Sequence, residues 1–165
     1  MIELIPATPE LLRAIIANSL AALAPLCNNG AEICEAARLA AEQSLAHYDR
    51  VGATAPWAGY FARDDDAIVG ICAFAAPPKD GEVEVAYGTF APLEGYGVAT
   101  AMAERLIAIA SSEPTIRFVT ANTAPEENAS THILRKLGFA RDGSITDADI
   151  GEAWHWRRVT HAHEG

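Results

Sequence analysis

Apolar residues recur with two different periods along the chain, and the change of period separates a helical first third from a strand-rich remainder. Residues 2–5 form a short apolar run that predicts a first strand. Thr8 is a favourable helix N-cap, Pro9 suits the first helical position, and an acidic residue follows in the first turn. The pattern then predicts a helix over residues 10–26. A second, alanine-rich helix is predicted over residues 31–48.

Short apolar runs with turn signals between them begin at Trp57. Residues 57–63 and 67–75 are separated by three consecutive aspartates, which predicts a β-hairpin. A second turn is predicted at residues 77–81. Residues 82–90 follow as a strand, in which Glu82, Glu84 and Ala86 alternate with Val83, Val85 and Tyr87.

Helical and extended segments alternate in the last third of the chain. Apolar residues at helical spacing predict a helix over residues 97–111. A strand is predicted at 117–121 and another helix at 128–137, before a final hairpin from Phe139 to Val159. The resulting order, β-α-α-β-β-β-α-β-α-β-β, predicts a mixed α/β fold in a single domain that spans residues 1–165.

The composition narrows the classes of partner. The 165 residues, half of them apolar, suffice for one domain with its own core. The net charge of −10 and the lack of a basic stripe argue against a nucleic-acid binder. An acidic surface near a site would attract a cationic acceptor such as an amine. A homodimer is left open.

The thiols and histidines give no metal signal. Cys27, Cys34 and Cys72 have no CxxC spacing, so we expect free, partly buried thiols. His161 and His163 are neighbours in the tail without acidic or thiol partners, so no metal is expected there. The N-terminus has no basic stretch followed by a long apolar one, and no run is long enough for a membrane span. We therefore expect a cytoplasmic protein without a membrane partner.

A glycine-rich turn follows the strand at 82–90. The segment PLEGYGVA places glycines at 95 and 97 and a small residue at 99, directly before the helix at 97–111. Backbone N–H groups there can approach a ligand closely and lie at the positive end of the helix dipole, so they form an anion site suited to a pyrophosphate. Position 100 is Thr, so the dinucleotide-binding fingerprint G-x-G-x-x-G is incomplete. A tightly packed helix N-terminus is the alternative.

This turn resembles the acetyl-CoA motif Arg/Gln-x-x-Gly-x-Gly/Ala of the GNAT superfamily of N-acetyltransferases, with Gly97 and Ala99 at its two small positions. Upstream, GICAFAAPPKDGEVEVAYGTFAP resembles the third and fourth strands of the branch that contains the ribosomal-protein N-terminal acetyltransferases. Downstream, TAPEENASTHILRKLGF is similar to the fourth-helix signature of that branch. The resemblance covers residues 68–159. It implies a central mixed sheet of six to seven strands, about four helices, and fourth and fifth strands that splay apart.

The resemblance also implies the chemistry: acetyl transfer from acetyl-CoA, without a metal, to a small-molecule or protein N-terminal amine. The implied cofactor-binding residues are Thr89, Phe90, Ala91, Glu94, Gly95, Tyr96, Gly97, Val98, Ala99, Thr100, Asn122 and Asn128. Backbone groups near residues 89–91 would pair with the pantetheine arm, and an N–H there would face the thioester carbonyl. The family motif has Arg or Gln where this chain has Glu94.

Two residues are expected to carry catalysis. Glu84 lies where the branch has a Glu proposed as a base that acts through water, and a carboxylate in a half-buried groove suits a base. Glu82, on the same strand face, is the alternative base. Ser130 matches a branch Ser beside the sulfur and is the candidate acid. Other GNAT members have a Tyr acid where this chain has Leu134, while His132 is expected to be solvated.

The two asparagines have open roles. Asn122 is expected to hold the pantetheine or the acceptor, or to shape the following turn. Asn128 is expected to contact the cofactor arm, to cap its helix, or both. Two alternatives to an enzyme also stay open at this stage: a non-catalytic coenzyme A-binding or regulatory module, suggested by Glu94, and a nucleotide-phosphate binder that uses the same helix N-terminus.

Overall fold

The computed structural model describes residues 1–24, 31–90, 97–148 and 150–160 of the chain. In these residues the elements are, in chain order, β1 (Ile2–Pro6), α1 (Pro9–Ala17), α2 (Ser19–Leu23), α3 (Ala31–Val51), β2 (Gly59–Asp64), β3 (Ala67–Phe74), β4 (Glu82–Thr89), α4 (Val98–Ser111), β5 (Phe118–Thr123), α5 (Ala129–Lys136), β6 (Ala140–Asp147) and β7 (Gly151–Val159). The order follows the prediction, with one additional helix near the N-terminus.

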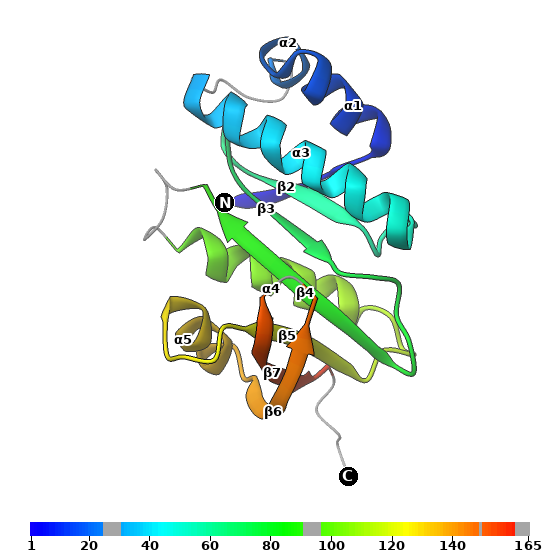
Figure 1. Ribbon diagram of the computed structural model, residues 1–165, viewed down its shortest axis with the longest axis vertical. Coiled ribbons are helices and arrows are strands. Elements are labelled where there is room, and N and C mark those ends of the chain that lie inside the picture. The colour runs from blue at the N-terminus through cyan, green and yellow to red at the C-terminus, as the bar shows by residue number, and fades with distance from the viewer. Residues whose placement is uncertain (25–30, 91–96, 149, 161–165) are drawn as a thin grey trace.

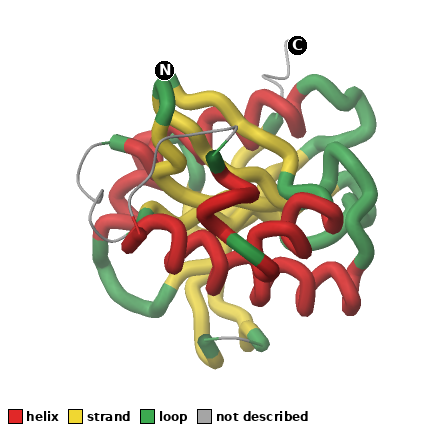
Figure 2. The backbone as a smooth tube through the Cα atoms, turned by 90° about the horizontal axis from the view of Figure 1, so that it is seen from above, coloured by secondary structure: helices red, strands yellow, loops and turns green. Residues whose placement is uncertain are grey.

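The strands form one seven-stranded sheet in the order β1-β2-β3-β4-β5-β7-β6. Neighbouring strands are antiparallel except β4 and β5, which are parallel. Figure 1 shows β4 crossing the middle of the molecule, and Figure 2 shows the end of the β6–β7 hairpin extending beyond the helices. The predicted mixed sheet of six to seven strands is therefore confirmed.

The two central strands separate part-way along their length. β4 and β5 pair at only three positions, the last of which joins Glu84 to Thr120. β4 then continues to Thr89 along β3, while β5 continues to Thr123 along β7. The predicted splay of the fourth and fifth strands is confirmed, and it opens a gap in the sheet beside the carboxyl end of β4.

Helices cover both faces of the sheet. One core cluster joins buried residues of α1–α3 to Phe61, Ile68 and Phe90 on one face. A second, larger cluster joins α4 and α5 to the other face, where Val83, Val85, Val119 and Trp156 lie. In Figure 1, α1–α3 lie together at one end of the molecule and α5 lies beside the β5–β7–β6 part. Each face of the sheet therefore has its own core cluster.

The predicted helix over residues 10–26 is wrong in its length. Thr8 caps α1 as expected, because its side chain accepts from the Leu11 N–H at 3.1 Å, but α1 ends at Ala17. Asn18 is extended, with φ −160°, and its side chain accepts from the Ala21 N–H at 3.2 Å. Asparagine is among the best N-caps, so it starts a second short helix instead of continuing the first.

Smaller differences concern the ends of the other elements. α3 continues to Val51, three residues beyond its predicted end, and Gly52 follows it in the left-handed conformation at φ +84°. β2 begins at Gly59 instead of Trp57. The Trp57 ring packs edge-on against Phe74, with ring centroids 5.0 Å apart, so it serves as packing, as expected.

Candidate active site

The carboxyl end of β4 and the first turns of α4 and α5 enclose a cavity of about 450 Å³, here called the thioester cavity. Its lining residues are Tyr87, Gly88, Thr89, Gly97, Val98, Ala99, Thr100, Ala129, Ser130 and Ile133. Gly97 is the N-cap of α4 and has the left-handed conformation, with φ +76°. The N–H groups of a first helical turn have no partner within the helix and suit an anion.

Gly97 leaves this helix start open. A Cβ atom built there would meet no other atom within 4 Å, so the backbone borders free space. Glycine is also the residue that adopts the left-handed conformation most readily. The open space, the N-terminus of a fourteen-residue helix and the adjoining cavity fit a pyrophosphate group with its attached arm.

The thioester cavity brings together part of the predicted cofactor site. Thr89 and the predicted residues from Gly97 to Thr100 line it, as does Ser130. Four predicted positions, Ala91, Glu94, Gly95 and Tyr96, lie outside the described residues.

Phe90 lies elsewhere. Its side chain is buried in the α1–α3 core, and its N–H donates to the Val69 carbonyl at 3.1 Å. The expectation that Phe90 contacts the cofactor has no support in this geometry, because both its side chain and its N–H are engaged in the fold.

The hydrogen bonds of β4 indicate which of its backbone groups face the gap. The Phe90 N–H and the Glu84 carbonyl both bond toward β3, the latter to the Ala75 N–H at 2.9 Å. Backbone direction alternates along a strand, so the N–H and carbonyl groups of Tyr87 and Thr89 face the opposite side. That side is where β5 has diverged. These two residues present the backbone groups that an extended arm could pair with.

A second cavity, of about 400 Å³, here called the acceptor cavity, borders the preceding part of β4. Its wall comes from α3, β3, β4, β5 and the β6–β7 connection, and includes Ser44, His47, Tyr48, Ile71, Ala73, Glu84, Val85, Ala86, Asn122, Asp147 and Ile150. Residues 84–86 of β4 line this cavity and residues 87–89 line the thioester cavity. The two cavities therefore share one continuous strand.

Glu84, the predicted base, is held by a hydrogen-bond network. The Asn122 side-chain Nδ2 donates to Glu84 Oε1 and, at 3.2 Å, to Asp147 Oδ2. His155 Nδ1 lies 2.8 Å from Asn122 Oδ1. Asn122 lines the acceptor cavity. Two residues that the sequence analysis did not single out, Asp147 and His155, contact its side chain.

Glu82 has a different environment. Its carboxylate forms an ion pair with Arg157, whose guanidinium also lies over the Phe118 ring at 4.5 Å. Glu82 is not among the described residues that line the acceptor cavity. Although Glu82 and Glu84 share a strand face as expected, of the two only Glu84 lines the acceptor cavity.

The wall of the acceptor cavity opposite Glu84 comes from α3. His47 Nε2 donates to the Ala75 carbonyl at 2.5 Å, and the Arg50 guanidinium donates to His47 Nδ1 at 3.3 Å. Tyr48 donates to the Ala7 carbonyl at 2.9 Å and accepts from the Gly59 N–H at 2.8 Å, and burial raises the pKa of its hydroxyl. These contacts fix α3 against the sheet, so this wall is preformed.

A family model described as an acetyltransferase (GNAT) domain matches residues 4–140 of the chain, which is most of its length. The chain belongs to the GNAT acetyltransferase family. The resemblance inferred from the glycine turn and the fourth-helix signature is thereby confirmed, and the acyl-transfer interpretation is favoured over a non-catalytic module or a nucleotide binder.

Solved structures of GNAT proteins share the fold. The chain aligns with the ribosomal L7/L12 alpha-N-protein acetyltransferase RimL with a TM-score of 0.66 at 15% identity, over 98% of this chain and 94% of that one. It aligns with aminoglycoside acetyltransferase AAC(6')-Ib in complex with coenzyme A with a TM-score of 0.67 at 18% identity, over 96% and 95%. It also aligns with the microcin C7 self-immunity acetyltransferase MccE, in complex with acetyl-CoA and AMP, with a TM-score of 0.64 at 16% identity, over 96% and 92%. No curated protein matches at the sequence level.

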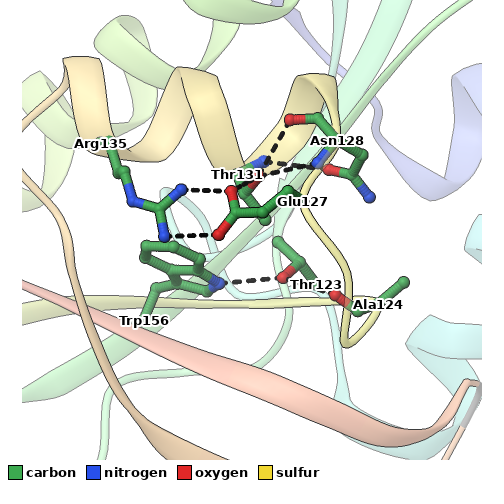
Figure 3. Close-up of polar contacts among 7 residues, drawn as sticks. All are labelled: Thr123, Ala124, Glu127, Asn128, Thr131, Arg135 and Trp156. Carbon is green, nitrogen blue, oxygen red and sulfur yellow. Dashed lines mark hydrogen bonds and ion pairs between the residues drawn. The ribbon is translucent and has the colours of Figure 1, made fainter.

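The GNAT helix that carries Ser130 is fixed at its N-terminus, as Figure 3 shows. Asn128 caps α5 by accepting from the Thr131 N–H at 3.0 Å, and the Thr131 hydroxyl accepts from the Asn128 N–H at 2.9 Å. Asn128 is exposed and does not line the thioester cavity among the described residues. Of the predicted roles of Asn128, the structure shows the helix cap.

Arg135 of α5 contacts both Glu127, which precedes the helix cap, and Trp156 of the sheet. The Arg135 guanidinium bonds Glu127 with both of its terminal nitrogens and lies 5.0 Å from the Trp156 ring centroid. The hydrogen bond from Arg135 lowers the pKa of the Glu127 carboxyl. The buried Trp156 donates from Nε1 to Thr123 Oγ1 at 2.9 Å. These contacts hold α5, and with it Ser130, in a fixed position beside the thioester cavity.

The burial of four further residues can be compared with what the sequence predicts. Leu134 is fully buried, so it serves the core where other GNAT members carry a tyrosine. His132 is exposed on α5, as expected. Cys34 and Cys72 are buried and form no disulfide, and burial raises the pKa of the Cys72 thiol to about 12. Cys27, His161 and His163 lie outside the described residues.

Among the described residues, no group of three or more His, Cys, Asp or Glu side chains is arranged to hold a metal ion. No helix in the described ranges is both long and apolar enough to cross a membrane.

Proposed function

We propose that this GNAT protein transfers the acetyl group of acetyl-CoA to a primary amine by direct attack within a ternary complex, with Glu84 as the base. The observation that carries the proposal is the division of β4. Its residues 84–86 line the acceptor cavity and its residues 87–89 line the thioester cavity, so an amine and a thioester would meet along one strand.

Binding of acetyl-CoA is assigned to the thioester cavity. Backbone N–H groups at Gly97 and in the first turn of α4 would hold the pyrophosphate, supported by the helix dipole. The pantetheine arm would pair with backbone groups of Tyr87 and Thr89 in the gap that β5 leaves. Acetyl-CoA supplies an activated acetyl group. The residues of the chain orient the thioester and the amine and transfer the protons.

Glu84 is suited to accept the proton that the amine must lose. Its carboxylate lies at the acceptor cavity, oriented by the Asn122 amide. The amine nitrogen forms a bond to the acetyl carbon while its proton passes to Glu84, directly or through one water molecule. A β4 backbone N–H facing the gap stabilises the negative charge that develops on the carbonyl oxygen.

Ser130 is suited to the other proton transfer. The carbon–sulfur bond breaks as the amide forms, and the sulfur needs a proton to leave as a neutral thiol. Ser130 lines the thioester cavity from the first turn of α5. Its hydroxyl would pass a proton to the sulfur and regain one from solvent, while Glu84 returns its proton to solvent. The products are then an acetamide and free coenzyme A.

The acceptor is a primary amine of a small molecule or of a protein N-terminus. The acceptor cavity, at about 400 Å³, has the size of a small-molecule site. Two proteins of the same fold, an aminoglycoside acetyltransferase and a ribosomal alpha-N-protein acetyltransferase, have amine acceptors of both kinds. The cytoplasmic location and the homodimer stay predictions from the sequence.

An amine panel tests the proposal. The chain is incubated with acetyl-CoA and, in turn, short alkyl amines, spermidine, an aminoglycoside and a peptide with a free N-terminus, while release of the coenzyme A thiol is followed. We expect thiol release that depends on the amine, with the acetylated amine detected by mass spectrometry. Reactions without amine, or with the pre-acetylated amine, are the controls. No binding of acetyl-CoA at millimolar concentration, measured by calorimetry, would contradict the proposal.

A further inference from the structure

The sheet register brings a histidine into line with the proposed base. Glu84 pairs with Thr120 across the β4–β5 boundary, and Asn122 pairs with His155 across β5 and β7. Thr120 and Asn122 are two residues apart, so their side chains share one face of β5. The three strands therefore place Glu84, Asn122 and His155 in a row on the face that borders the acceptor cavity.

The Asn122 amide has partners at every polar position. Its nitrogen carries two hydrogens, and it donates to Glu84 Oε1 and to Asp147 Oδ2. Its oxygen lies 2.8 Å from His155 Nδ1. If the amide were turned over, its oxygen would face two carboxylates, which have no hydrogen to give when ionised. The two carboxylates therefore fix the nitrogen toward themselves and the oxygen toward His155.

This orientation determines where His155 carries its proton. An amide oxygen only accepts hydrogen bonds, so Nδ1 must be the donor. A neutral imidazole has one N–H, and in peptides without such a contact either nitrogen can carry it. In this site the proton is on Nδ1 in the neutral ring, and it is there in the imidazolium as well. The contact between His155 and Asn122 is thus the same in both protonation states.

We propose that His155 is a positioning residue for acetyl transfer: its Nδ1–H holds the Asn122 amide, and the amide holds the Glu84 carboxylate at the acceptor cavity. The proposal rests on the proposed role of Glu84 as base. Without the His155 donor, the half-buried Asn122 oxygen loses its partner, and the amide is held from one side only, through its bonds to Glu84 and Asp147. A base displaced by a fraction of an ångström to one ångström can lose up to about a hundredfold in rate.

The effect is expected in turnover and not in the binding of acetyl-CoA. The thioester cavity is lined by other residues of β4 and by α4 and α5, and Asn122 and His155 are not among its described lining residues. Asn122 lies in the acceptor cavity instead. A residue that served only the stability of the sheet would lower the fraction of folded protein, which lowers the apparent kcat and leaves KM unchanged. The kcat of each variant is therefore expressed per folded molecule, with the folded fraction taken from its urea titration.

Two substitutions at His155 distinguish the effect of its N–H donor from the effect of its ring size. His155→Phe keeps a ring of similar size and removes the donor, whereas His155→Asn keeps an N–H at the same distance along the side chain. We expect His155→Phe to lower kcat by about tenfold or more, with the KM for acetyl-CoA changed less than about twofold. His155→Asn should recover most of kcat. His132→Phe, on the exposed face of α5, is the matched control and should leave kcat unchanged.

A double substitution tests whether His155 acts through the base. In a Glu84→Gln background, His155→Phe should cause no further loss of kcat, because the group that it positions is gone. Equal losses in His155→Phe and His155→Asn, or a full further loss in the Glu84→Gln background, would overturn the proposal.

A measurement without turnover separates this proposal from the proposed function. Long-range ¹H–¹⁵N spectra of the histidine side chains should show His155 with its proton on Nδ1, assigned by the loss of that signal in His155→Phe. The Asn122→Ala variant should shift the proton toward Nε2. An Nε2–H tautomer in the unaltered protein would overturn the positioning role, whereas a protein that has the Nδ1–H tautomer but acetylates no amine would overturn the proposed function alone.

Discussion

At the scale of single residues, the side chains of Glu84, Asn122 and His155 form a row of hydrogen bonds beside the acceptor cavity. Alternation along residues 82–90 placed Glu84 on a strand face opposite buried valines, and the structure agrees. Asn122 was expected near the pantetheine or the acceptor, and it lies at the acceptor cavity. His155 is 33 residues from Asn122 in the chain, and only the register of β5 on β7 brings the two together. No local pattern carries that information.

Gly97 provides a prediction at this scale. Valine cannot adopt φ near +76° without steric strain, so Gly97→Val should displace the first N–H groups of α4. We expect acetyl-CoA affinity, measured by calorimetry, to fall by about tenfold or more, because a helix N-terminus binds an anion only through correctly directed N–H groups.

Gly97→Asn is the matched control for that substitution. Asparagine tolerates the left-handed conformation, and a Cβ at this position meets open space, so affinity should stay within a few-fold of the original protein. Equal affinities of the valine variant and the unaltered protein would show that this turn does not bind the pyrophosphate.

At the scale of elements, caps decided where the sequence prediction succeeded and failed. Thr8 and Pro9 correctly marked the start of α1, and the Asn128 segment marked the start of α5. The helical pattern continued past Asn18, however, and periodicity alone does not distinguish one helix from two that share a face. The break lies at Asn18, whose side chain accepts a hydrogen bond from a backbone N–H and so ends one helix and caps the next. In the sequence, this single polar residue is a weaker signal than the apolar residues at helical spacing on both sides of it.

The cap of α5 leads to a prediction about Asn128. Asn128→Ala removes the oxygen that accepts from the Thr131 N–H, and should lower the free energy of unfolding by about 1 kcal/mol in urea titrations. Because Asn128 does not border the thioester cavity in the described structure, acetyl-CoA affinity should change little.

Asn128→Asp keeps an acceptor at the same position and a favourable charge at the helix N-terminus, so it should retain stability. A large loss of acetyl-CoA affinity in Asn128→Ala with unchanged stability would instead assign this side chain to the cofactor arm.

At the scale of the whole molecule, the splay of β4 from β5 is the feature on which the account depends. Two motifs in the correct order identified the family, and with it the sheet and the splay. The acceptor cavity could not be predicted, because its wall combines α3, β3, β4, β5 and the β6–β7 connection, which together span more than a hundred positions of the chain. The splay leaves backbone groups of β4 free for an extended ligand, while the paired half of the same strand positions Glu84.

The central claim is that Glu84 is the base of an acetyl transfer. The most direct test measures kcat and acetyl-CoA affinity together for Glu84→Gln, which keeps the size of the side chain and an oxygen for the Asn122 amide. With an amine that the unaltered protein acetylates, we expect kcat to fall by about a hundredfold or more, in line with loss of general-base catalysis, and the Kd for acetyl-CoA from calorimetry to change less than about twofold. An unchanged kcat would contradict the account.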